Sequence, residues 1–168
     1  MSDEPAPEPA SPPFPTEGRL AGIDYGSVRV GVAVCDSRQT LAGPFEMYAR
    51  RTRELDADYF RRLTTRERIA GYVVGLPIHL DGGESAKSVE ARAFGRWLAE
   101  VTATPVVFYD ERFSSAQADE ALAMGQLTKK RRKERRDMLA AQIMLAAFLE
   151  SKHRGAVDPG SIDDRRRR

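Results

Sequence analysis

The sequence predicts an α/β domain in which a mixed central sheet, an antiparallel meander plus parallel strands, is flanked by helices. Three β-rich segments come first, and a helix–strand–helix–strand alternation and further helices follow them, which is the pattern of a sheet covered by helices. The chain has 168 residues, 41% of them hydrophobic and 31% charged. These values are typical of one globular domain with a sizeable core.

The first three segments predict the meander. Residues 19–25 and 29–35 are joined at Gly26-Ser27, a connection short enough for an antiparallel hairpin. Residues 40–49 predict a third strand. Gly43-Pro44 interrupts that strand, so we expect it at an edge of the sheet or with a bulge.

The next segments alternate between helical and strand patterns. Apolar residues at helical spacing predict a helix over 53–68 and a second one around 89–101, where Phe94 and Trp97 occupy core positions. The continuous apolar run 69–76 and the short run 105–109 predict strands, the first of them covered on both faces.

The last third of the chain predicts two more helices. Ser114 and Gln117 form a capping box that would open a helix to about residue 124. Residues 138–149 are apolar around most of the helix circumference, which indicates burial against the sheet.

The ends of the chain differ in composition from the middle. Residues 1–18 are rich in Pro and acids and residues 154–168 are basic, so we expect two disordered tails around a folded domain at 19–153. No apolar run approaches the length of a membrane helix and no signal-peptide core is visible. Cys35 is the only cysteine and stands in an apolar strand, which fits a core position in a cytoplasmic protein.

Carboxylates interrupt segments that should be apolar. Asp24 lies in the first strand, Asp110 and Glu111 directly follow the run 105–109, and Asp137 precedes the last apolar helix. Strand ends at one edge of a parallel sheet would bring these groups together, where they would repel one another unless a cation intervened. Oxygen ligands favour Mg²⁺ or Mn²⁺, and two such ions suit phosphodiester cleavage.

Each acid also has a simpler interpretation. Asp137 could only cap the last helix, and Asp110 and Glu111 could be turn residues paired with Arg112. Asp24 is the hardest to explain in this way, because a buried carboxylate without a partner is rare.

Two further segments are candidates for substrate binding. A contiguous basic run precedes the last helix and comprises Lys129, Lys130, Arg131, Arg132 and Lys133, with Arg135 and Arg136 after it. It is either a solvated loop or a contact for phosphates, and its density favours the contact. Gly75 and Asp81 belong to a glycine-containing segment that could contact phosphate or form a plain surface turn. Arg29 and Arg112 flank the acids and could bind phosphate.

Four motifs together resemble one family. GIDYGSVRVGVAV, VVGLPIHLDG, YDERFSS and the aspartate before MLAAQIML occur in the order and spacing of the YqgF/RuvX family, whose members are similar to the resolvase RuvC. The resemblance covers residues 19–149 and implies an RNase H-like fold. It also implies a cytoplasmic nuclease that matures the 5′ end of precursor 16S rRNA, with Asp24, Glu111 and Asp137 as its catalytic, metal-binding acids and Asp110 as a neighbouring acid. The preceding basic run and the residues Met138-Leu139 depart mildly from the family pattern.

We therefore expect metal-dependent hydrolysis of structured RNA. In this hypothesis Asp24 bridges two Mg²⁺ or Mn²⁺ ions, Glu111 and Asp137 hold one each, and the basic run clamps the backbone. One alternative is a junction resolvase on DNA, which would require a homodimer rather than a monomer. Another is a non-catalytic ribosome assembly factor. An actin-like ATPase, suggested by the first motif alone, would require a second domain.

Overall fold

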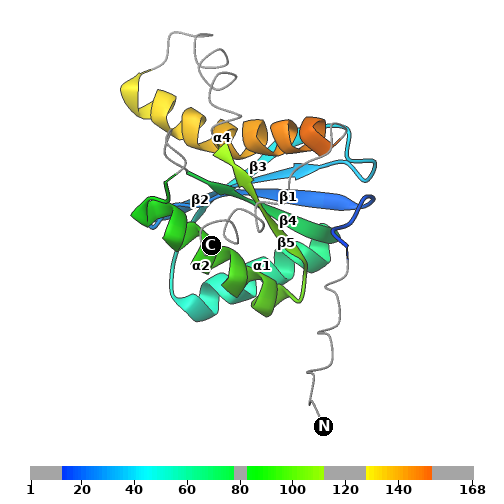
Figure 1. The fold of residues 1–168 in the computed structure, drawn as a ribbon. Helices are drawn as coiled ribbons and strands as arrows, with labels where there is room; N and C mark the ends of the chain where they lie inside the picture. The colour runs from blue at the N-terminus through cyan, green and yellow to red at the C-terminus, as the bar shows by residue number, and fades with distance from the viewer. Residues whose placement is uncertain (1–12, 78–82, 112–127, 153–168) are drawn as a thin grey trace.

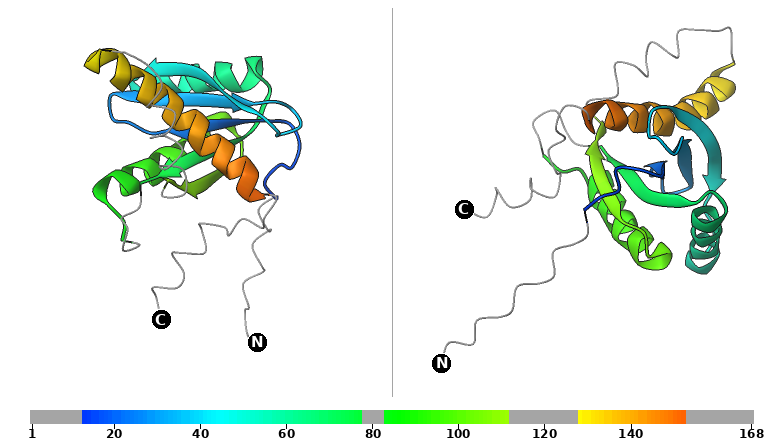
Figure 2. Two further views of the ribbon diagram at one scale, coloured as in Figure 1. Left: turned by 90° about the horizontal axis from the view of Figure 1, so that it is seen from above. Right: turned by 90° about the vertical axis from the view of Figure 1, so that its right-hand side faces the viewer.

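The protein is described by a computed structural model that covers residues 13–77, 83–111 and 128–152. A five-stranded sheet lies between helix α4 on one face and helices α1 and α2 on the other (Figure 1, Figure 2). In chain order the elements are β1 (Arg19–Asp24), β2 (Arg29–Cys35), β3 (Ala42–Ala49), α1 (Arg53–Arg66), β4 (Ile69–Leu76), α2 (Ala86–Thr102), β5 (Val106–Asp110) and α4 (Lys129–Lys152). The expected mixed α/β architecture is confirmed.

The strands are ordered β3-β2-β1-β4-β5. β2 pairs antiparallel with β1 and β3, whereas β1, β4 and β5 are parallel. The meander is therefore confirmed, and β3 is an edge strand with a register irregularity opposite Val32/Ala33, as Gly43-Pro44 predicts. Because β2 alone runs in reverse, β1, β3, β4 and β5 all end at one side of the sheet, which we call the C-terminal edge.

Serine and threonine caps set the starts of α1 and α2. The Thr52 hydroxyl accepts from the Leu55 amide at 3.3 Å. Ser85 accepts from the Ser88 amide at 3.1 Å, and its hydroxyl also donates to the Pro77 carbonyl at 3.1 Å. This second bond fixes the start of α2 beside the end of β4, at the C-terminal edge.

Two apolar cores fill the space between the layers. Under α1 and α2, Phe60 is fully buried and meets Tyr72, Phe94 and Trp97 edge-on. The other core lies under α4 and includes Cys35, which is buried as its sequence context predicts. Edge-to-face contacts add to the burial of apolar area, so Phe60 organises the first core.

Part of the expected N-terminal tail packs on the domain. The ring of Phe14 lies 5.9 Å from that of Phe148 and covers Gly71, where a Cβ would come within 2.8 Å of it. Residues 1–12 and 153–168, and the capping box at Ser114, lie outside the described residues.

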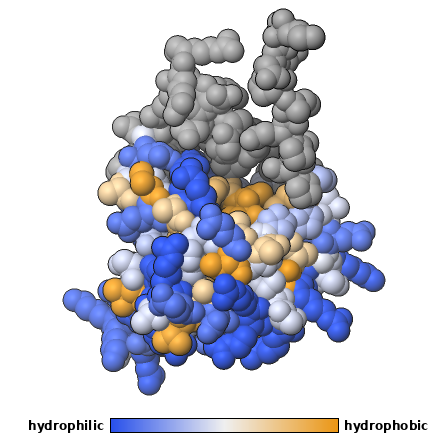
Figure 3. All heavy atoms as spheres, turned by 90° about the horizontal axis from the view of Figure 1, so that it is seen from below, coloured by the Kyte–Doolittle hydropathy of each residue, from blue (hydrophilic) through white to orange (hydrophobic). Residues whose placement is uncertain are grey.

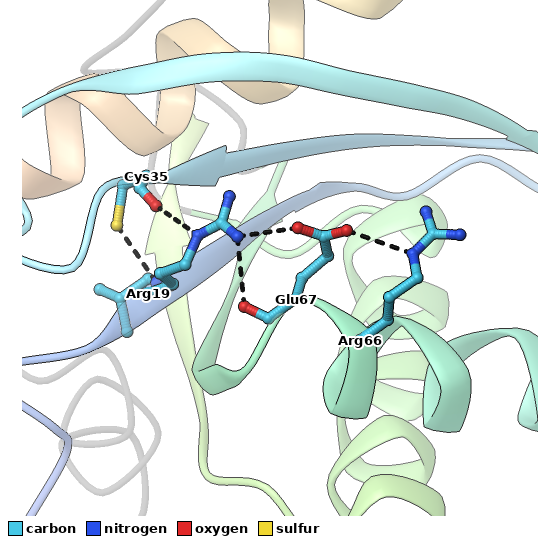
Figure 4. Close-up of polar contacts among 5 residues, drawn as sticks. Arg19, Cys35, Arg66 and Glu67 are labelled. Carbon is cyan, nitrogen blue, oxygen red and sulfur yellow. Dashed lines mark hydrogen bonds and ion pairs between the residues drawn. The ribbon is translucent and has the colours of Figure 1, made fainter.

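Arg19 ties three elements together at the opposite edge of the sheet (Figure 4). Its guanidinium donates to the Cys35 carbonyl at 3.3 Å and to the carboxylate of Glu67 at 2.8 Å. The Leu20 amide donates to the Cys35 sulfur at 3.1 Å, and Arg66 pairs with the other carboxylate oxygen of Glu67 at 3.2 Å. These contacts join the start of β1, the end of β2 and the end of α1.

Helix α4 begins earlier than the sequence pattern predicts. The expected opening at Asp137 is wrong, because the helix starts at Lys129 and the basic run forms its exposed first two turns. Lysine, arginine and glutamate are good helix formers and require no buried face. Thr128 supplies the start, since its hydroxyl and carbonyl accept from the amides of Arg131 at 3.4 Å and Arg132 at 2.9 Å.

The contact of α4 with β1 yields a test of packing. A Cβ on Gly22 would come within 2.8 Å of the Leu145 Cβ, whereas one on Gly43 would meet nothing within 4 Å. Gly22→Ala should lower the free energy of unfolding by about 1 to 3 kcal/mol, because overpacking forces α4 to move. The matched control Gly43→Ala should change it by less than about 0.5 kcal/mol. Urea midpoints that shift equally in both variants would contradict this packing.

Candidate functional site

Asp24 is the last residue of β1 and lies half-buried at the C-terminal edge. It pairs with Gly31 of β2, and its side chain faces α4. A Cβ on Gly31 would lie 3.4 Å from the Asp24 Cβ and 2.9 Å from the Asp137 carbonyl oxygen. The missing side chain at Gly31 therefore lets α4 bring Asp137 close to Asp24.

Glu111 reaches the same place from β5. It directly follows the strand, and its carboxyl shares a hydrogen bond with that of Asp24. A Cβ on Gly75 would lie 2.5 Å from Glu111 Oε1, so the side chain of Glu111 lies across this glycine of β4. The expected convergence of strand ends is thus seen in the contact between two of the acids.

The electrostatics of the pair follow from burial and from neighbouring charges. Burial raises the pKa of Glu111 to about 7, and the charges of Asp24 and Asp110 raise it as well. Burial also raises the pKa of Asp24, with a smaller contribution from the Asp137 charge. A proton held between Asp24 and Glu111 relieves the repulsion of two carboxylates at short range.

Lys87 opposes both shifts and was missed by the sequence reasoning. Its charge lowers the pKa of Asp24 and of Glu111, so its ammonium group lies within electrostatic reach of the pair. Lys87 is the second residue of α2, a helix with no acidic residue in its first turn. A cation there opposes the usual preference of a helix N-terminus for acids. This departure from the usual preference is the sequence signal that could have identified Lys87.

The side chain of Asp110 points to the opposite face of the sheet from that of Glu111. It is 6% exposed and pairs with Leu76, which belongs to the core under α1 and α2. Since paired residues of neighbouring strands share a face, Asp110 faces that core while Glu111 faces α4. Asp110 therefore acts on Glu111 through its charge.

The remaining predicted residues fall in three groups. Arg29 is exposed at the start of β2, on the C-terminal edge, and Gly75 is buried within β4. Residues 129–133 of α4 are exposed and precede Asp137 by one to two helical turns, about 6 to 12 Å along the axis. Arg112 and Asp81 lie outside the described residues.

No group of three or more His, Cys, Asp and Glu side chains within residues 13–77, 83–111 and 128–152 is close enough to be assigned as a metal site. Within the same ranges, no helix has the length and apolar character needed to cross a membrane.

Comparison with known proteins gives consistent results. The family model RuvX, described as Holliday junction resolvase, matches residues 18–151. A protein of Rhodopirellula baltica named "Putative pre-16S rRNA nuclease" is 49% identical over 90% of this chain and 88% of its own length. A protein of the same name from Rhodobacter capsulatus is 37% identical over 82% of this chain and 86% of its own.

Solved structures confirm the fold. Thermus thermophilus RuvC, solved in complex with a Holliday junction substrate, superposes with a TM-score of 0.53 at 18% identity, over 80% of this chain and 96% of that one. The chain therefore has the RNase H-like fold of RuvC, as the sequence motifs imply.

The raised pKa of Glu111 predicts a pH-dependent stability. Its pKa is about 7 in the folded protein against an ordinary value of 4.5, so stability should fall as pH rises between these values. Glu111→Gln should remove this loss and, above pH 7, increase the free energy of unfolding by on the order of 1 to 3 kcal/mol. Thermal unfolding in EDTA between pH 4.5 and 8 measures it.

The control for this prediction is Glu54→Gln, which alters an exposed acid in the first turn of α1. It should retain the pH dependence of the unaltered protein. The same pH dependence in both variants would show that Glu111 does not carry the buried charge.

Proposed function

Because this chain belongs to the RuvX family, we propose that it is a nuclease that hydrolyses phosphodiester bonds of structured RNA during maturation of precursor 16S rRNA in the cytoplasm. The names of its relatives support the reaction and the substrate. The observation that carries the proposal is the half-buried Asp24–Glu111 carboxyl pair at the C-terminal edge, with Asp137 beside it and the basic turns of α4 next to it.

The carboxyl pair is suited to a divalent cation. Asp24 and Glu111 share a proton where two anions would otherwise repel each other, and a cation can replace that proton. The oxygen donors favour Mg²⁺ or Mn²⁺, and Asp137 supplies a third carboxylate nearby. When bound, such ions stabilise the attacking and leaving oxygens of a phosphodiester cleavage.

The chain's own residues prepare the site. Asp24 and Glu111 must lose their shared proton to act as ligands, and the positive charge of Lys87 favours that loss. The exposed first turns of α4, residues 129–133, bind phosphates next to the cleaved bond. Gly31 and Gly75 keep the three acids close by leaving room for α4 and for Glu111.

The second candidate is a DNA junction resolvase, which the family description and the RuvC fold favour. Symmetric cutting of two strands would require a homodimer, whereas RNA maturation allows a monomer. Size-exclusion chromatography, combined with competition between a four-way DNA junction and precursor rRNA, distinguishes the two. Preference for the junction by a dimeric protein would replace the RNA proposal.

Removal of the Asp24 charge tests the chemistry. Asp24→Asn should abolish cleavage of precursor 16S rRNA in Mg²⁺ or Mn²⁺, with a loss of at least about 100-fold, because the amide cannot supply an anionic ligand. It should also remove the rise in melting temperature on addition of the metal. The control Asp58→Asn changes an exposed acid of α1 and should cleave normally.

The results of this test separate the remaining hypotheses. Unchanged cleavage by Asp24→Asn would contradict the proposed site. A non-catalytic assembly factor would show neither cleavage nor a metal-dependent thermal shift in the unaltered protein.

Lys87 should set the pH at which the carboxyl pair ionises in the absence of metal. In Lys87→Met the pKa values of Asp24 and Glu111 should rise further, so the loss of stability with rising pH, measured by thermal unfolding in EDTA, should extend to higher pH than in the unaltered protein. Lys87→Arg retains the charge and should restore the original pH dependence. Identical profiles in the Met and Arg variants would show that the Lys87 charge does not act on the pair.

A further inference from the structure

Three arginines at the junction of β3 and α1 lie over aromatic rings on the face opposite α4. The guanidinium carbon of Arg50 lies 5.4 Å from the centroid of Tyr25, that of Arg51 lies 5.7 Å from Tyr48, and that of Arg53 lies 5.8 Å from Trp97. We call Arg50, Arg51 and Arg53 the arginine face. Guanidinium groups over aromatic rings form planar cationic surfaces, with one side held by the ring.

The arginine face lies at the edge of the sheet that carries the acids. Ala49 ends β3 opposite Arg29, and β3 is two strands from β1, about 10 Å across the sheet. Tyr25 directly follows Asp24 and belongs to the core under α1 and α2, whereas Asp24 faces α4. We call the site formed by Asp24, Glu111 and Asp137 the acidic site. The end of β1 therefore connects the acidic site on one face of the sheet to the arginine face on the other.

A buried carboxylate holds the arginine face in place. Asp56 is 1% exposed, and it accepts from the Tyr48 hydroxyl at 2.8 Å, the Arg51 amide at 2.9 Å and Arg50 Nε at 3.3 Å. Arg50 also donates to the Tyr25 hydroxyl at 3.2 Å. Arg50 thus neutralises the charge of Asp56 and fixes the segment that connects β3 to α1.

The other two arginines retain their charge for a partner. Arg51 and Arg53 are exposed, and neither forms an ion pair with any residue that the structure describes. The side of the molecule that carries α1 and α2 shows hydrophobic residues between hydrophilic ones (Figure 3). Exposed guanidinium groups suit a partner with both anionic and planar groups.

We propose that the arginine face binds an unpaired nucleic-acid strand that continues from the acidic site across the C-terminal edge. The proposal rests on the proposed nuclease function and adds to it the form of the substrate. Arg51 and Arg53 bind its phosphates and stack on its bases, while residues 129–133 of α4 hold the segment on the other side of the edge. The substrate is thus a structured nucleic acid with an unpaired extension next to the cleaved bond.

Trp97 provides a direct reporter, because it is the only tryptophan of the chain and Arg53 lies over its ring. In the Asp24→Asn background, which prevents cleavage, we would titrate an RNA hairpin with an unpaired extension, the same hairpin without it, and the matching DNA molecules. The extended molecules should change the Trp97 emission, and the blunt hairpins should leave it unchanged. Equal changes with both, or none with either, would overturn the proposal.

Affinity measurements on variants complete the test. The double variant Arg51→Gln with Arg53→Gln should weaken binding of the extended hairpin by on the order of ten-fold. The slope of the logarithm of the binding constant against the logarithm of the salt concentration should become shallower by about 1.4. Arg51→Lys with Arg53→Lys should retain the slope and lose part of the affinity, because lysine lacks the stacking plane. The control Arg62→Gln with Arg66→Gln removes two exposed charges from the far end of α1 and should have a smaller effect.

The outcomes separate this proposal from the nuclease function. Equal losses in the two glutamine double variants would show a general charge effect and overturn the arginine face. Failure of the unaltered protein to cleave any RNA or DNA, with binding through Arg51 and Arg53 intact, would overturn the nuclease function alone. A preference for the DNA or the RNA extension identifies the kind of strand bound.

Discussion

The close approach of α4 to the sheet is the constraint on which the site depends. Two glycines on the side of the β1–β2 hairpin that faces α4 make this close approach possible. A Cβ on Gly22 would meet Leu145, and one on Gly31 would meet the backbone of Asp137. Gly22 and Asp24 alternate along β1 and face the same helix. β1 therefore leaves room for α4 at Gly22 and places a carboxylate two residues later at Asp24. The closeness of α4 to the sheet sets how near Asp137 comes to Asp24.

The half-buried carboxyl pair of Asp24 and Glu111 is electrostatically unfavourable within this well-packed domain. Burial raises the pKa of both Asp24 and Glu111, and the charge of Asp24 raises that of Glu111 further, so ionising the pair weakens the folded state. The Lys87 charge offsets part of this cost from the start of α2, which the Ser85–Pro77 hydrogen bond fixes in place. Groups kept in such a state commonly serve function rather than stability. Under the proposed function, this unfavourable state of the acids would be relieved by a bound cation.

The sequence predicts the sheet and the approach of Asp24 to Glu111 because strand direction and strand ends can be read from local patterns. It misplaces the start of α4, since periodicity reports only a buried face and residues 129–136 have none. Lys87 was missed because its proximity to the acids depends on how α2 packs on β4. Arg50 and Arg53 were missed because their aromatic partners, Tyr25, Phe94 and Trp97, come from other segments of the chain.

The direction of β2 links these features. As the one reversed strand, it places the ends of β1 and β3 at the same edge. The acids and the arginine face are therefore neighbours, although Asp24 and Ala49 are 25 positions apart in sequence. A cluster of carboxylates alone would repel a polyanion. Exposed basic side chains on α4 and at the junction of β3 and α1 flank the acids on both faces of the sheet, and their field would favour the approach of a polyanion. The formal net charge of only +2 conceals this arrangement, because opposite charges are segregated rather than mixed.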